Sequence, residues 1–219
     1  GGDAAARECP FLERCVRMIA IIDYGAGNLF SVKNALDYLQ IENQITANPA
    51  ELAAADGMIL PGVGAFRDAM TMLNQSGFTE AIKQQVKAGK PLLGFCLGMQ
   101  MLFEKGYEFG ETDGLGLIPG CVQRIDSGGL KIPHMGWNDL TVLHDCALSA
   151  DVQDGDYVYF VHSYRAETSD DYISCYATYH EKIPVLVFCD NIYGAQFHPE
   201  KSGQVGMGIL KNFARLVTT

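Results

Sequence analysis

The 219-residue sequence predicts an α/β protein of three layers, with a mostly parallel central sheet, helices on both faces and added antiparallel strands. Two observations lead to this prediction. In the first half, short apolar runs alternate with segments of helical periodicity, and neighbouring parallel strands require such crossovers. In the second half, β-prone runs follow one another too closely to leave room for helices, which favours antiparallel pairing.

Three strand-to-helix units fill the first half. Each consists of an apolar strand, a loop containing glycine and then apolar residues at helical spacing. We expect the strands at 18–22, 57–60 and 90–95 and the helices at 29–39, 66–73, 78–86 and 98–103.

The second half consists mainly of strands. We expect antiparallel additions to the sheet at 121–125, 140–143, 157–161, 172–179 and 185–189, and a further strand at 193–197. A closing helix is predicted over about 206–217, with Leu210, Phe213 and Val217 facing the core.

Composition excludes several classes of function. Sixteen basic residues against 26 acidic residues leave a formal net charge of -10, which repels phosphate backbones and anionic lipid surfaces. The longest apolar runs are far shorter than the roughly 20 residues of a membrane helix. We therefore expect neither a nucleic acid nor a membrane as partner. With 48% hydrophobic residues, the chain can bury one core, and we expect a single domain over 18–219.

The cysteines and the first residues indicate where the protein works. Seven cysteines are scattered without CxxC pairs, so we expect no disulfide framework, no metal site and no cofactor, and a reducing cytoplasm as the setting. Residues 1–17 differ in composition from the strand that Met18 opens, and they lack the apolar stretch of a secretory signal. We expect them to be a leader or extension foreign to the native protein.

Cys96 lies between an apolar strand and a helical segment, with Gly94 and Gly98 two positions away on either side. These glycines suit a sharp strand-to-helix turn, in which larger side chains would collide. Such a turn places a thiol at a helix N-terminus, where thiolates are favoured. A free cysteine taken alone is more often a small core residue. The turn, together with the cysteine, predicts a nucleophile.

His198 follows a predicted strand and precedes Pro199 and Glu200. Proline favours extended backbone at His198, and residues two apart then point to the same side, so the carboxylate can orient the imidazole. Ligand sites of open α/β sheets lie at the carboxyl ends of strands, where we expect these side chains to meet Cys96. Four histidines lack such neighbours and are interpreted as surface or hydrogen-bonded residues: His134, His144, His162 and His180.

The segment Pro61-Gly62-Val63-Gly64 follows another predicted strand. Attack of a thiolate on an amide produces a tetrahedral oxyanion, and one hydrogen-bond donor to it contributes roughly 2.7 to 4 kcal/mol. The backbone N–H groups of Val63 and Leu97 are the two candidate donors. The glycines would let the loop approach a substrate closely and let the Val63 peptide rotate. Taken alone, this loop is equally compatible with an ordinary tight turn.

These motifs together resemble those of the class I glutamine amidotransferases, whose catalytic triad is Cys-His-Glu. The matching segments are Gly94 to Gln100 (GFCLGMQ) and His198-Pro-Glu200. More narrowly, the chain is similar over 18–217 to the glutaminase subunits of imidazole glycerol-phosphate synthases. That similarity is carried by DYGAGN at 23–28, PGVGAF at 61–66, PHMGWN at 133–138 and FVHSY at 160–164. Related amidotransferases carry different residues at 61–66. The resemblance implies the flavodoxin-like, three-layer fold of the family.

The resemblance also implies how glutamine is bound. Six residues would hold the substrate: the side chains or backbone of Gln100, Glu108, Ser163 and Tyr164, and the backbone of Gly62 and Gly64. Glu108 would pair with the α-ammonium group of glutamine. Without the resemblance, a lone glutamate after a helix would be interpreted as solvated.

A partner is implied as well, a (β/α)8-barrel cyclase subunit that forms a heterodimer with the glutaminase and uses its ammonia. The products would be imidazole glycerol phosphate and an aminoimidazole carboxamide ribotide, in histidine biosynthesis. Ammonia that meets water is protonated and is no longer a nucleophile, so we expect a dry passage between the subunits. The candidate contacts are Asn28, Trp137, Asn138 and Lys201, although core packing explains a single tryptophan equally well. Because the Val63 peptide can rotate, we expect weak glutaminase activity without the partner.

Three alternatives remain open from the sequence. The chain could be a glutaminase that serves a different synthase, a catalytically silent binding or regulatory module of the same fold, or a cysteine peptidase or related hydrolase. The presence of all three triad residues weighs against the silent module.

Overall fold

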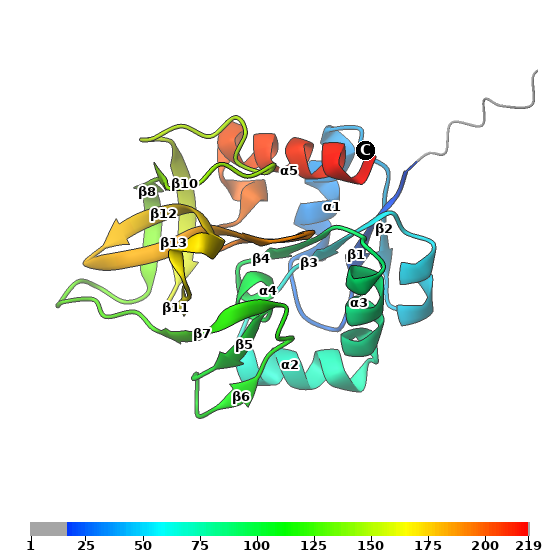
Figure 1. The fold of residues 1–219 in the computed structure, drawn as a ribbon, viewed down its shortest axis with the longest axis horizontal. Helices are drawn as coiled ribbons and strands as arrows, with labels where there is room; N and C mark the ends of the chain where they lie inside the picture. The colour runs from blue at the N-terminus through cyan, green and yellow to red at the C-terminus, as the bar shows by residue number, and fades with distance from the viewer. Residues whose placement is uncertain (1–16, 219) are drawn as a thin grey trace, which may run out of the picture.

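The structure, a computed structural model, describes residues 17–218 and is built around an eight-stranded sheet (Figure 1). Five strands run parallel: β1 (Ile19–Ile22), β2 (Asn43–Thr46), β3 (Gly57–Leu60), β4 (Leu92–Phe95) and β14 (Ile192–Ala195). Three are antiparallel additions: β9 (Thr141–Val142), β12 (Ile173–Tyr179) and β13 (Glu181–Cys189). Their order is β2-β1-β3-β4-β14-β13-β12-β9, which confirms the predicted mostly parallel sheet with added antiparallel strands and places those strands at one side.

Helices cover both faces of this sheet, as predicted (Figure 1). On one face lie α1 (Leu29–Tyr38) and α5 (Gly203–Thr218), and on the other lie α2 (Phe66–Gln75) and α3 (Phe78–Lys87). Successive strand residues point to opposite faces, so Ile19 and Ile21 of β1 join the α1 and α5 cluster, whereas Ala20 and Ile22 join the α2 and α3 cluster. The predicted core residues of the closing helix are buried: Leu210, Phe213 and Val217.

Two smaller sheets correct part of the prediction. The runs at 121–125 and 157–161 form strands, but these strands do not join the central sheet. One small sheet pairs β10 (Tyr157–His162) with β8 (His134–Asp139), and the other contains β5 (Phe103–Gly106), β6 (Thr112–Asp113), β7 (Ile118–Arg124) and β11 (Tyr164–Glu167). Their pairing partners were not predicted because segments such as FEKG and HMGWND contain glycine and polar residues in place of an apolar run.

The helix expected over 98–103 was also wrong. The helix α4 (Leu97–Gln100) makes a single turn, and Phe103 begins β5. The carbonyls of Met101, Leu102 and Phe103 accept hydrogen bonds from the backbone of the segment 115–118, and this competes with continuation of the helix. Three short 3-10 helices complete the described elements: η1 (Pro49–Ala53), η2 (Asp170–Tyr172) and η3 (Pro199–Lys201).

The predicted leader, residues 1–17, lies outside the described part of the chain except for Arg17, whose guanidinium donates to the Val217 carbonyl at 2.8 Å. Between residues 17 and 218, no helix has both the length and the apolar character needed to cross a bilayer. Within the same residues, no three His, Cys, Asp or Glu side chains are grouped so that they could hold a metal ion.

Candidate active site

Cys96 occupies a strained turn between β4 and α4. Its φ of 51° and ψ of -111° lie in a region that non-glycine residues rarely adopt, and such backbone strain is concentrated at functional sites. The turn is held from both sides, because the Cys96 N–H donates to the Ala195 carbonyl at 2.8 Å and its carbonyl accepts from the Gln100 N–H at 3.2 Å. This is the geometry of a nucleophile elbow, in which the side chain stands at the end of a strand.

Close backbone packing around the elbow requires glycine. A Cβ added to Gly98 would lie 1.9 Å from the Leu60 carbonyl oxygen, and one added to Gly94 would lie 2.6 Å from the Gly98 oxygen. A Cβ on Gly62 would lie 2.6 Å from the Gly98 nitrogen. The loop after β3 is therefore pressed directly against the first turn of α4. This contact brings Val63 and Leu97, the two predicted oxyanion donors, to the same place.

His198 comes next to Cys96 because β14 pairs in parallel with β4, with Ala195 opposite Phe95. His198 Nδ1 lies 3.1 Å from Glu200 Oε1, and the two side chains are only 8% and 5% exposed. The turn η3 is fixed by Ser202, whose hydroxyl donates to the His198 carbonyl at 2.7 Å and accepts from the Tyr159 N–H at 3.1 Å. Three predicted triad residues thus lie at one edge of the sheet.

The surroundings of His198 favour its charged form. Burial by itself lowers the pKa of this imidazole, but interactions with the side chains of Cys96 and Glu200 outweigh burial and raise the pKa from 6.5 to about 9. His198 is therefore an imidazolium at neutral pH, beside the sulfur that would act as nucleophile. A charged imidazole can donate a proton to a leaving amine.

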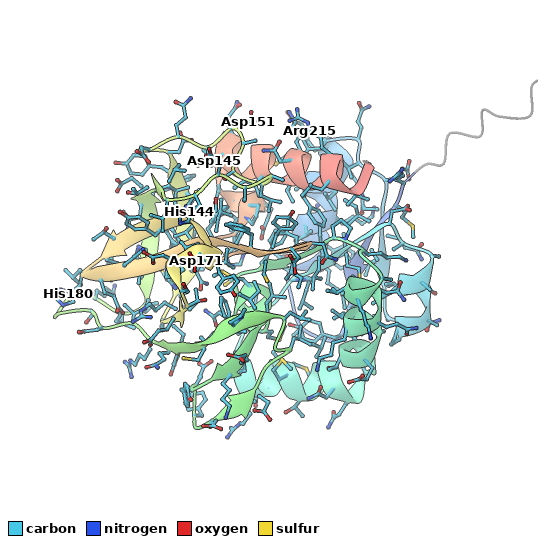
Figure 2. All side chains as sticks on the ribbon, viewed as in Figure 1. His144, Asp145, Asp151, Asp171, His180 and Arg215 are labelled. Atoms are coloured by element: carbon cyan, nitrogen blue, oxygen red, sulfur yellow. The ribbon has the colours of Figure 1, made fainter. Side chains whose placement is uncertain are left out.

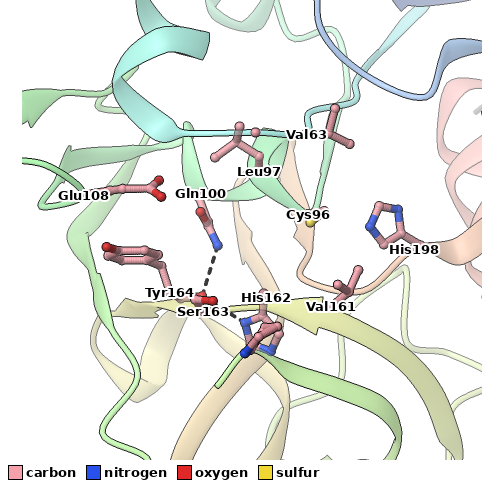
Figure 3. A pocket seen from close by; sticks show the side chains of 12 residues that line it. Val63, Cys96, Leu97, Gln100, Glu108, Val161, His162, Ser163, Tyr164 and His198 are labelled. Atoms are coloured by element: carbon pink, nitrogen blue, oxygen red, sulfur yellow. Dashed lines mark hydrogen bonds between the residues drawn. The ribbon is translucent and has the colours of Figure 1, made fainter. Parts of the chain in front are cut away.

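Cys96 and His198, two of the three predicted triad residues, line a pocket of about 380 Å³ (Figure 3). In Figure 3, Cys96 and His198 lie at one side of this pocket, and Glu108 and Tyr164 lie at the other. Gly62 is the one predicted substrate-binding residue that does not line this pocket, and it lines a narrow crevice instead. The described residues that line the pocket are Val63, Gly64, Cys96, Leu97, Gln100, Glu108, Pro133, Val161, His162, Ser163, Tyr164 and His198.

Two side chains of the pocket have fixed orientations. Glu108 Oε2 accepts a hydrogen bond from the Phe66 N–H at 2.9 Å, at the first residue of α2. Gln100 Nε2 donates to the Tyr164 carbonyl and to Gln196 Oε1, both at 3.1 Å. Among the described residues lining the pocket, Glu108 carries the single carboxylate. The pocket therefore presents a negative group at the end opposite the thiol, which suits a ligand with an ammonium group there.

The residues predicted to contact a partner lie around the same edge. Trp137 is 56% exposed, so the alternative that it packs in the core was wrong. Lys201 is exposed at the end of η3, and Asn28 shares the narrow crevice with His198 and Glu200. Asn138 is half-buried and turns inward, donating to the Thr178 carbonyl at 3.1 Å.

The sequence did not identify His162 as a residue of the pocket. His134 and His162 are hydrogen-bonded, as the sequence allowed, and both are buried, whereas His144 and His180 are exposed (Figure 2). Burial lowers the pKa of His134 and of His162 to about 4, so both are neutral at pH 7. The alternation of β10 was the available signal, since it places His162 on the same side as Val158 and Phe160, both fully buried.

Comparisons with known proteins agree with this geometry. The sequence model of the family "Glutamine amidotransferase class-I" matches residues 20–217. The chain is 52% identical over 200 residues to the imidazole glycerol phosphate synthase subunit HisH of Streptococcus mutans, covering 91% of this chain and 99% of the relative. It is 49% identical over 197 residues to the subunit of the same name from Listeria innocua, covering 90% and 94%.

Solved structures with low sequence identity share the fold. The structure of PurLQS from Thermotoga maritima matches with a TM-score of 0.73 at 19% identity, covering 91% of this chain and 98% of that one. The crystal structure of a glutamine amidotransferase from the same organism matches with a TM-score of 0.60 at 16% identity, covering 92% and 82%.

Proposed function

The chain belongs to the class I glutamine amidotransferase family, and we propose that it hydrolyses glutamine to glutamate and ammonia with Cys96, His198 and Glu200 as its catalytic triad. One observation carries this assignment of residues: a strained cysteine elbow and a histidine paired with a buried carboxylate follow neighbouring parallel strands and face one pocket.

The first step forms a thioester. The Cys96 sulfur attacks the side-chain amide carbon of glutamine, and the carbonyl oxygen takes up the electron pair as an oxyanion. Collapse of this intermediate breaks the C–N bond, and His198 gives its proton to the departing nitrogen, so that ammonia leaves. Glu200 holds the imidazole in the orientation for this transfer.

The second step returns the enzyme to its starting state. A water molecule attacks the thioester carbon, and neutral His198 accepts a proton from that water. A second oxyanion forms and collapses, the C–S bond breaks, and glutamate is released. The N–H groups of Val63 and Leu97 are the proposed donors to both oxyanions, because the loop of Val63 packs against the first turn of α4.

Substrate selection is assigned to the opposite end of the pocket. Glu108 pairs with the α-ammonium group of glutamine, and Gln100, Ser163, Tyr164 and the backbone of Gly64 surround the rest of the molecule. Gly62 contributes indirectly, because its lack of a side chain allows the loop to pack against α4.

The ammonia is delivered to a (β/α)8-barrel cyclase subunit that produces imidazole glycerol phosphate and an aminoimidazole carboxamide ribotide in histidine biosynthesis. The relatives named as imidazole glycerol phosphate synthase subunits support this assignment. Exposed Trp137 and Lys201 near the triad fit a heterodimer contact, together with Asn28 and Asn138. We place this reaction in the cytoplasm and treat 18–219 as one domain, which the family match over 20–217 supports.

Ammonia release is the decisive measurement. Purified wild type and Cys96→Ala are each assayed with glutamine, alone and with the cyclase and its ligand. We expect release by the wild type, stimulation by the complex and no release by Cys96→Ala.

This assay, together with covalent labelling and a peptide-cleavage assay, separates the alternatives. Glutamine-dependent ammonia release without cyclisation by the barrel protein would indicate a different synthase. A wild type that neither releases ammonia nor reacts with a glutamine-mimicking electrophile would indicate a silent module. Cleavage of peptides without release of ammonia from free glutamine would indicate a peptidase.

A further inference from the structure

Three polar side chains outside the proposed triad form a continuous hydrogen-bonded chain that ends at the pocket. His134 and His162 are directly opposite each other in the β8–β10 ladder, and His134 Nδ1 lies 2.9 Å from His162 Nε2. At the outer end, Asn138 Nδ2 lies 3.3 Å from His134 Nε2. At the inner end, His162 Nδ1 lies 2.9 Å from the Tyr164 carbonyl oxygen.

The direction of every hydrogen bond in this chain is determined from its ends. A carbonyl oxygen only accepts, so His162 Nδ1 carries the proton and donates to Tyr164. Asn138 is oriented independently, because its Nδ2 donates to the Thr178 carbonyl and its Oδ1 accepts from the Asp139 N–H. Its second amide hydrogen therefore points to His134 Nε2. Both histidines are then neutral Nδ1–H tautomers, and each donor meets an acceptor.

The surroundings of His134 and His162 keep both rings in the neutral form. The ring of His134 is stacked between Phe160 and Tyr179, with ring centroids 4.7 Å and 4.1 Å away. His134 and His162 are 3% and 6% exposed. Burial also lowers the pKa of both imidazoles to about 4, so the neutral forms that the hydrogen bonds require persist at neutral pH.

The hydrogen-bonded chain ends at Tyr164, a residue that lines the pocket. The Tyr164 carbonyl accepts two hydrogen bonds, one from His162 and one from Gln100 at 3.1 Å (Figure 3). The preceding carbonyl, that of Ser163, accepts from the Ile125 N–H at 3.0 Å. Ser163 lies between β10 and β11, where the chain passes from one small sheet to the other, so these bonds determine the course of the backbone that lines the pocket.

We infer that Asn138, His134 and His162 are positioning residues that hold the backbone at Ser163 and Tyr164 in the geometry that binds glutamine. This inference rests on the proposed glutaminase function for the identity of the ligand. These hydrogen bonds should affect substrate affinity, because they end at the Tyr164 carbonyl in the wall of the pocket. They do not contact the thiol of Cys96 or the His198–Glu200 pair.

Replacing His162 with asparagine or glutamine keeps a nitrogen at the place of one ring nitrogen and loses the other. In His162→Asn, the amide nitrogen takes the place of Nδ1 and can still donate to the Tyr164 carbonyl. In His162→Gln, the amide reaches the place of Nε2 and leaves that carbonyl without its second donor. We expect His162→Gln to raise the KM for glutamine about tenfold with kcat little changed, because the direct donor to the Tyr164 carbonyl is lost. His162→Asn keeps that donor and loses only the link to His134, so its KM should rise by about threefold.

A control variant, a direct binding measurement and a third variant show whether a change in KM reflects glutamine binding and neither misfolding nor the chemical step. His144→Gln, at an exposed histidine outside the chain, should leave KM unchanged. In a Cys96→Ala background, titration calorimetry should show the same order of glutamine affinities. If both His162 variants unfold, the less buried Asn138→Ser tests the same chain, with an expected KM increase of about threefold.

Nitrogen NMR of the imidazole rings tests the hydrogen-bonded chain directly in the wild type. We expect His134 and His162 to be neutral Nδ1–H tautomers at pH 7, and His134→Asn should perturb the resonances of His162. Nε2–H tautomers, or equal glutamine affinities for His162→Gln and His162→Asn, would overturn the inference. A wild type without ammonia release would contradict the proposed function, whereas the tautomers and the glutamine affinities would still decide the inference.

Discussion

His198 Nδ1 and Glu200 Oε1 lie 3.1 Å apart, two residues from each other in the chain and almost completely enclosed. Because the pKa of His198 rises from 6.5 to about 9 in the folded chain, the folded state binds this proton more tightly than the unfolded state. The resulting stability is fully present below pH 6.5 and is lost as the pH rises through 9.

The first prediction concerns this loss of stability as the pH rises. Between pH 6.5 and 9, the free energy of unfolding of the wild type should fall by about 1 to 3 kcal/mol through this group. In His198→Gln the decline should be smaller, since the titrating imidazole is absent. Urea unfolding at several pH values measures the effect, and equal declines in both proteins would contradict it.

The second prediction concerns thiol reactivity. A glutamine-mimicking electrophile should label Cys96, with excess glutamine protecting it, and peptide mapping should locate the adduct. Burial raises the pKa of Cys175 to about 12 and also raises the pKa of Cys189, so these thiols should stay unlabelled at neutral pH. Cys121→Ala is the control and should be labelled as the wild type is. Glutamine-protected labelling that persists in Cys96→Ala would refute the assignment of the nucleophile.

The third prediction concerns the packing of the elbow. In Gly98→Ala, the new Cβ would lie 1.9 Å from the Leu60 oxygen, so the first turn of α4 or the loop after β3 must move. We expect a loss of about 2 to 4 kcal/mol in unfolding free energy and a fall in kcat. Gly208→Ala, in α5 and with no heavy atom beyond the adjacent backbone of its own helix within 4 Å of the new Cβ, should instead stabilise the protein by up to about 1 kcal/mol. Similar stabilities for both variants would show that the elbow tolerates a side chain.

The fourth prediction concerns the partner. Trp137 is exposed and close to Tyr159, with ring centroids 5.9 Å apart, so Trp137→Ala should leave the fold intact. Its loss should weaken cyclase binding at least tenfold, as expected for an exposed aromatic anchor. Titration calorimetry measures the affinity. Tyr38→Ala, at an 80% exposed residue of α1, should bind as the wild type does. Unchanged binding by Trp137→Ala would remove this residue from the interface.

The fifth prediction concerns the oxyanion loop. Val63 is 44% exposed and followed by Gly64 at a φ of +97°, so its peptide has room to rotate. The isolated chain should release ammonia slowly, and the cyclase with its ligand should raise kcat about 100- to 1,000-fold, the effect of one oxyanion donor. A chain that is fully active alone would rule this out.

Local chemistry determined much of the candidate site. Glycines around Cys96 predict a sharp turn because the constraint acts within two residues, and Pro199 predicts that His198 and Glu200 share a side for the same reason. Hydrophobic periodicity likewise predicted α2 (Phe66–Gln75) and α3 (Phe78–Lys87) closely. The identity of Glu108 as a pocket residue came only from the family resemblance.

The sequence by itself determined the elbow at Cys96, the His198–Glu200 pair and the alternation of strands and helices that requires a mostly parallel sheet, since each depends on residues close together in the chain. Only the tertiary structure decided that β10 pairs with β8, that α4 ends after one turn, that Trp137 is exposed and that His162 faces the pocket. The physical reason is that backbone groups find hydrogen-bond partners far away in sequence, as when the segment 115–118 donates to the carbonyls after α4. The periodicity of one segment does not predict which distant strand supplies those partners.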